Sequence, residues 1–95
     1  MYKVEIEKVD KKSIIYAKDL KEVSEALKNI TATSVKVNKI DEITYKIETL
    51  IQHKTKEELL DLRSQFVNAY MIQKDEYQVR ALQRIDERLK ENDEQ

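Results

Sequence analysis

Three arginines recur at intervals of four residues near the end of the chain: Arg80, Arg84 and Arg88. On a helix this spacing aligns them along one side, and a guanidinium group can bind two oxygens of a phosphate or a carboxylate. The row could therefore contact nucleic acid or an acidic protein surface. Each arginine also has an acid three or four residues away, and such helical pairs stabilise by about 0.2–0.5 kcal/mol each. We favour pairing within the helix, or a flank beside a helix–helix contact, over phosphate contact; the acids are Glu76, Glu87 and Glu91.

A second basic group lies near the start of the chain, where it is formed by Lys3, Lys8, Lys11, Lys12, Lys18 and Lys21. Tyr2 and Tyr16 could stack on nucleic-acid bases beside these lysines, but both occupy apolar positions, so we expect them in the core. Four acids dilute the group, namely Glu5, Glu7, Asp10 and Asp19. A nucleic-acid-binding regulator that uses these lysines or the arginine row is therefore the alternative function. The formal net charge of -1 gives such binding no general support.

Residues suited to catalysis are scarce. His53 is the only histidine, and the chain has neither cysteine nor glycine. These absences exclude a thiolate nucleophile, cysteine-ligated zinc, a glycine-rich phosphate loop and a nucleophile elbow. The acidic neighbours Glu57 and Glu58 do not converge on a metal, because adjacent helical residues point about 100° apart, and the same holds for Asp86 and Glu87. We therefore predict an exposed His53, no catalytic site, no metal site and no cofactor.

The composition predicts a single folded domain. Of the 95 residues, 40% are hydrophobic and 39% are charged, which leaves enough apolar side chains for one core. The amino terminus lacks the apolar segment of a signal peptide, and no stretch approaches the length of a membrane span. We expect a cytoplasmic protein that does not enter membranes. The bias toward lysine, isoleucine, asparagine and glutamate suggests a bacterial or bacteriophage origin.

Alternation of apolar and polar residues predicts a small antiparallel sheet. Residues 2–6 alternate, and residues 14–17 form a shorter run after a polar turn at 10–13, so the two are expected to pair as a hairpin. Residues 34–37 and 43–47 alternate in the same way and predict two further strands. The last of these segments also fits a helical face; its apolar residues are Ile43, Ile47, Leu50 and Ile51.

Three capping-box patterns, each an Asp or Thr followed three residues later by Glu or Gln, predict helix starts at Asp19, Thr55 and Asp75. The first pattern opens a helix over residues 20–28. We expect that helix to end at Asn29 in the left-handed conformation that glycine normally takes, and to bury one apolar face. The face consists of Leu20, Val23, Ala26 and Leu27.

The second and third patterns organise the C-terminal part of the chain. Residues 56–73 carry an apolar surface wider than the roughly 100° stripe of a surface helix, so we expect neighbours to cover two sides of this helix. Residues 77–89 carry a narrow apolar stripe that is typical of a helix docked on another helix. Segment 56–90 is expected to form one long helix or two, and residues 91–95 a frayed tail.

These elements predict an α+β fold, in which a small antiparallel sheet built in the order ββαββ is followed by one long or two C-terminal α-helices. A sheet-containing part (1–54) and a helical part (55–90) would form one domain. The wide apolar surface of the helices predicts a non-enzymatic protein-interaction module, such as an adaptor, an inhibitor or a regulatory subunit. We expect a homodimer through the C-terminal helices, or a protein partner bound by them. The residues expected to bind are Phe66, Tyr70, Tyr77, Arg80, Arg84, Ile85, Arg88 and Leu89.

Overall fold

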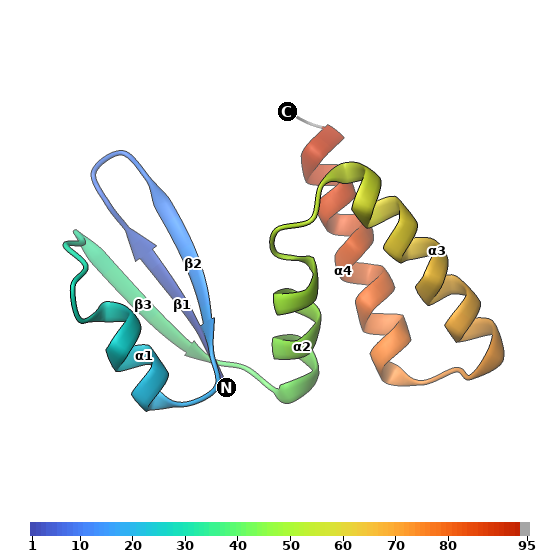
Figure 1. The fold of residues 1–95 in the computed structure, drawn as a ribbon, viewed down its shortest axis with the longest axis horizontal. Helices are drawn as coiled ribbons and strands as arrows, with labels where there is room; N and C mark the ends of the chain where they lie inside the picture. The colour runs from blue at the N-terminus through green and yellow to red at the C-terminus, as the bar shows by residue number, and fades with distance from the viewer. Residues whose placement is uncertain (94–95) are drawn as a thin grey trace. The chain divides into compact units, whose positions relative to one another are not determined.

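The computed structural model describes residues 1–93. The chain forms two compact units, residues 1–49 and residues 50–95. The expected class, a small antiparallel sheet followed by helices, is confirmed (Figure 1). The elements are β1 (Tyr2–Glu7), β2 (Lys12–Ala17), α1 (Leu20–Leu27), β3 (Ser34–Lys39), α2 (Glu42–Ile51), α3 (Lys56–Ile72) and α4 (Glu76–Asp93).

The sheet has three strands in the order β2-β1-β3, and both outer strands run antiparallel to β1. Val4 of β1 lies opposite Ile15 of β2 and opposite Val37 of β3. Because opposed residues of an antiparallel pair share a face, this register gathers alternate apolar residues of all three strands on one side of the sheet. Lys3 lies opposite Tyr16 on the other side, so Tyr16, which is half-buried, lies outside the core cluster that includes Tyr2.

Helix α1 completes the core of the first unit by packing against β1 and β2. The buried core residues are Val4, Ile6, Ala17 and Val23, and the apolar residues packed around them are Tyr2, Ile15, Leu27, Ile30 and Ala32. Leu20, which was expected on the buried face of α1, is 62% exposed. All six residues of β3 are exposed. The helix therefore covers the sheet over β1 and β2 and leaves β3 open.

Helix α1 begins where the capping pattern predicts, since the Asp19 carboxylate accepts a hydrogen bond from the backbone N–H of Glu22 at 2.8 Å. In a complete capping box the Glu22 carboxylate would accept from the N–H of Asp19. It accepts instead from the N–H of Lys18, one residue earlier, at 2.8 Å. The helix ends at Lys28 in a right-handed conformation, and no residue within 1–93 has a positive φ. The prediction that Asn29 takes the left-handed conformation is therefore wrong. A Cβ makes that conformation costly, and the chain turns after α1 without using it.

Residues 43–47 belong to helix α2, so the predicted fourth strand is wrong and the helical alternative is correct. The two patterns coincide because a separation of four residues is even, as on one face of a strand, and also spans about one helical turn. Ile43 and Ile47 satisfy both. The four-residue spacing continues from Ile47 to Ile51, beyond the predicted strand, and these two side chains are 1% and 0% exposed on the helix.

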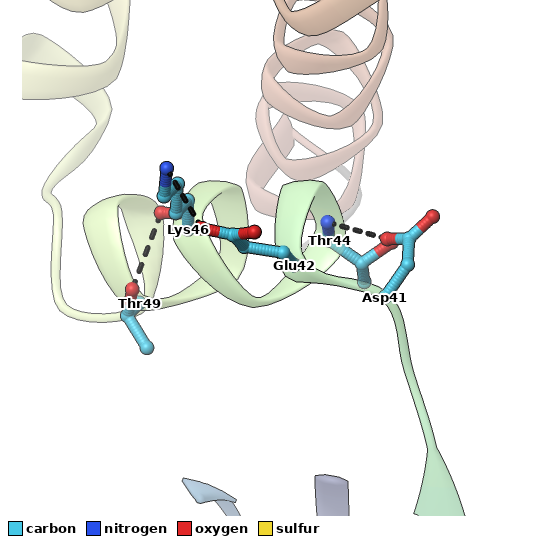
Figure 2. Close-up of polar contacts among 5 residues, drawn as sticks. All are labelled: Asp41, Glu42, Thr44, Lys46 and Thr49. Carbon is cyan, nitrogen blue, oxygen red and sulfur yellow. Dashed lines mark hydrogen bonds and ion pairs between the residues drawn. The ribbon is translucent and has the colours of Figure 1, made fainter. Parts of the chain in front are cut away.

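Polar contacts hold the start and the solvent side of α2 (Figure 2). The Asp41 carboxylate caps the helix by accepting from the N–H of Thr44 at 2.8 Å. One turn further, the Lys46 ammonium lies 3.1 Å from the carboxylate of Glu42, and the Thr49 hydroxyl donates to the Lys46 carbonyl at 3.2 Å. Asp41 is a capping residue, but the capping-box pattern requires Glu or Gln three residues later, and position 44 is a threonine. The pattern therefore did not predict the start of α2.

Helices α3 and α4 are two separate helices that pack against each other. The predicted capping box of α3 is complete, because the Thr55 hydroxyl accepts from the N–H of Glu58 at 3.2 Å and the Glu58 carboxylate accepts from the N–H of Thr55 at 3.1 Å. Helix α4 starts after Asp75, whose carboxylate accepts from the N–H of Gln78 at 3.2 Å. The polar residues at 73–75 therefore form a turn between two helices.

The coverage of α3 and the end of α4 differ from the predictions. Leu59 is the buried residue of α3, so the expectation that neighbours cover two sides of this helix is wrong. Helix α4 continues through Asp93, which makes the first part of the predicted tail helical, and residues 94–95 lie outside the described residues. The exposed fractions of apolar side chains on α3 are 49% for Leu60, 75% for Met71 and 88% for Ile72.

Replacing the capping residue of α3 should destabilise the second unit. Thr55→Ala removes the hydroxyl that accepts from the Glu58 N–H, and we expect it to lower the free energy of unfolding by about 1 kcal/mol in urea denaturation. Thr49→Ala is the control, because the Thr49 hydroxyl donates to carbonyls inside α2 and caps no helix. Equal losses in the two variants would contradict a special role for the cap.

The same capping box should make stability depend on pH. The hydrogen bond from the backbone N–H of Thr55, followed by the Thr55 hydroxyl contact, lowers the pKa of Glu58 below its ordinary value of 4.5. A pKa lowered by folding adds stability above the unfolded value, and this contribution is lost as pH falls through the folded value. We expect the difference in urea midpoint between the parent chain and Glu58→Gln to shrink as pH falls below 4.5. A constant difference across that range would refute the charge contribution.

Candidate partner-binding surface

The eight residues expected to bind a partner all lie on the hairpin formed by α3 and α4 (Figure 1). Leu59, Ala81 and Ile85 of these helices are at most 1% exposed. Ile85 is therefore a core side chain that a partner cannot reach in this structure. Leu89, one helical turn further along α4, is half-buried.

Aromatic side chains connect the two helices near the turn of the hairpin. The rings of Phe66 on α3 and Tyr77 on α4 have centroids 5.6 Å apart and are tilted by 58°, which is a favourable arrangement for two aromatic rings. The Lys74 ammonium lies 5.8 Å from the ring centroid of Tyr70, within the range of a cation–π contact. Phe66, Tyr70 and Tyr77 are all half-buried, so each keeps part of its ring exposed while it stabilises the hairpin.

The arginine row pairs with acids on its own helix, as the spacing predicts. Arg80 lies 3.6 Å from the carboxylate of Glu76, and Arg88 lies 3.8 Å from that of Glu91. Arg84 forms an ion pair with Glu87. Each of the three guanidinium groups thus has a carboxylate beside it, which reduces the positive potential that a phosphate would meet.

One ion pair between the helices was not predicted. The Nε of Arg63 on α3 lies 2.7 Å from a carboxylate oxygen of Asp86 on α4. The two residues are separated by 23 positions, so no local periodicity in the sequence indicates this pair. The contact follows only from the way α3 packs along α4.

The two most exposed large apolar side chains of the hairpin lie beside its turn. Met71 and Ile72 end α3 and are 75% and 88% exposed, and Val79, near the start of α4, is 39% exposed. We call these three residues the hairpin-end patch. Met71 and Ile72 belong to the apolar surface of α3 that was expected to be covered. Three consecutive apolar residues, Tyr70 to Ile72, exceed the width of one buried helical face, which indicates that at least one of them is exposed.

The described residues offer no arrangement suited to metal chemistry. No group of three or more His, Cys, Asp or Glu side chains within 1–93 is placed to hold a metal ion. His53 follows α2 and is exposed, as predicted. None of the helices described is both long enough and apolar enough to cross a membrane.

Comparison of the chain with protein-family models, with curated proteins and with solved structures finds no match.

Shortening the buried side chain of α4 should weaken the hairpin itself. Ile85→Ala removes apolar atoms from a fully buried position, and we expect a loss of about 2–5 kcal/mol in the free energy of unfolding. Met71→Ala, at an exposed position of similar chemistry, should change it by less than about 0.5 kcal/mol. Chemical denaturation of both variants tests the contrast, which equal losses would contradict.

Proposed function

We propose that this chain is a protein-interaction module whose α3–α4 hairpin associates with a second copy through the hairpin-end patch. The observation that supports this proposal is the exposure of Met71 and Ile72, at 75% and 88%, in the last turn of α3. Contiguous exposed apolar patches mark surfaces that meet other proteins, and these two side chains are adjacent. Adaptors, inhibitors and regulatory subunits work through such surfaces.

The size of the patch is suited to weak and reversible association. Burying an exposed apolar side chain of this size contributes about 1.5–3 kcal/mol. In a two-fold arrangement each residue is used twice, so Met71 and Ile72 together contribute about 6–12 kcal/mol. Association costs about 4–15 kcal/mol. The two ranges nearly cancel, so the patch supports at most a weak and reversible dimer.

The charges of the hairpin support a protein surface in preference to nucleic acid. Arg63, Arg80, Arg84 and Arg88 each lie beside a carboxylate. A phosphate backbone would have to displace these carboxylates before the arginines could neutralise its phosphates and release the counterions of the nucleic acid. An apolar contact between two copies leaves the arginine–carboxylate pairs of each copy intact, so it does not carry this cost.

The patch should control self-association. We expect sedimentation velocity at rising concentration to show a monomer–dimer equilibrium, and the double variant Met71→Ser/Ile72→Ser to shift it at least about tenfold toward monomer, which corresponds to 1.4 kcal/mol. Val9→Ser is the matched control, because Val9 is 93% exposed and lies on the turn between β1 and β2. The control should dimerise like the parent chain.

Two results would count against this proposal. A parent chain that stays monomeric up to millimolar concentration would remove the second copy as the occupant of the patch. An equal shift in Val9→Ser and in the double variant would show that exposed apolar side chains in general, and not this patch, cause the association. Unchanged urea midpoints in all three proteins establish that the hairpin itself is intact.

A further inference from the structure

Strand β3 is an open edge of the sheet in the first unit. It pairs with β1 along its whole length, and no other strand within residues 1–93 pairs with it. The pairing extends past the strand, because the N–H of Ile40 donates to the carbonyl of Met1 at 2.8 Å. All six residues of β3 are exposed. The strand is therefore held firmly on one side and is accessible on the other.

The register shows which backbone groups face outward. Residues of an antiparallel pair alternate between those that exchange hydrogen bonds with the neighbouring strand and those whose N–H and C=O point away from it. Since Ile40 bonds to β1, Asn38, Lys36 and Ser34 also direct their backbone groups toward β1. Val35, Val37 and Lys39 direct theirs outward, where a further strand could pair with them.

The side chains of β3 define what such a strand should carry. Val35 and Val37 lie opposite Ile6 and Val4, on the face that builds the core, yet they are 44% and 41% exposed. Lys36 lies on the opposite face, and both charged residues of the strand are lysines. Opposed residues share a face, so a complementary strand has apolar side chains against the valines and an acidic side chain against Lys36.

A second copy of β3 fits this edge poorly. Antiparallel self-pairing that sets Val35 against Val37 of the other copy brings Lys36 directly opposite its own counterpart, and like charges directly opposed in a sheet are destabilising. Shifting the register to centre on Val37 sets Val35 against Lys39 instead. Lysines on an open edge protect against self-pairing in this way.

We propose that β3 binds an extended segment of another protein, which adds to the sheet as a fourth strand and alternates apolar with acidic residues. Main-chain hydrogen bonds to Val35, Val37 and Lys39 provide affinity, and the alternating side chains provide selectivity. This surface belongs to the first unit and is independent of the hairpin-end patch. The chain would then carry two interaction surfaces, one for itself and one for a partner.

Backbone hydrogen exchange with a synthetic peptide of alternating valine and glutamate tests the proposal. In the free protein, the amides of Val35, Val37 and Lys39 should exchange fast, while those of Lys36 and Asn38 are protected by β1. Millimolar peptide should slow the first three at least about tenfold, as expected for amides that gain a hydrogen bond. A peptide of alternating valine and lysine should give no protection, because its charge repels Lys36.

A proline substitution separates the edge from the rest of the sheet. Val37→Pro removes an outward N–H and keeps the bonds to β1, a position that proline tolerates on edge strands. It should abolish the peptide-induced protection at Val35 and Lys39. Lys12→Pro is the matched control, because it lies at the start of the other edge strand, β2, and should bind peptide like the parent chain. Lys36→Glu should exchange the preference for the two peptides.

Lack of protection in the parent chain at millimolar valine–glutamate peptide would overturn the proposal, as would equal protection by both peptides. Val37→Pro is judged to have lost its fold if the amides of β1 lose their protection. In that case Lys36→Glu tests the proposal: a preference for the valine–lysine peptide supports it, and an unchanged preference overturns it. If Val37→Pro abolishes dimerisation and Met71→Ser/Ile72→Ser leaves it intact, the edge of β3 binds a second copy. The proposal of an acidic partner segment is then overturned.

Discussion

Side-chain capping is the interaction on which the structure most depends. Each of the four helices described begins after an Asp or Thr whose side chain accepts a hydrogen bond from the N–H three residues later; the capping residues are Asp19, Asp41, Thr55 and Asp75. A chain without glycine has few ways to shape its turns, and within 1–93 it uses no positive φ. The caps therefore determine where each helix starts, and so which apolar residues share a face.

The two surfaces proposed for binding arise from incomplete coverage within each unit. Helix α1 is eight residues long and packs against β1 and β2. The valines of β3 stay exposed, and no strand within residues 1–93 pairs with the outer edge of β3. Helix α3 buries Leu59 against its neighbours but ends with Met71 and Ile72 in solvent. The surfaces differ in chemistry: the first offers backbone groups beside lysines, whereas the second offers apolar side chains beside paired charges.

Local patterns predicted most of the elements and failed where one pattern suits two structures. The strands β1 and β2, the helix α1 and the capping box of α3 all follow from residues within four positions of one another. Residues 43–47 were ambiguous because their spacing suits a strand and a helix equally. The expectation that neighbours cover the end of α3 was wrong for another reason, because coverage depends on which distant residues pack there. Partner binding by Ile85, which is buried, stays a prediction.

The sequence alone determined the helix starts, the alternation of the hairpin strands and the pairing of the arginine row with acids on α4. Each of these depends on residues one to four positions apart, whose geometry is set by the local backbone. The tertiary structure alone decided that Ile85 is buried while Met71 is exposed, that Arg63 meets Asp86 across the hairpin, and that β3 lies at an edge. These outcomes depend on which distant elements pack together, and apolar residues with the same local periodicity can end on either side of such a contact.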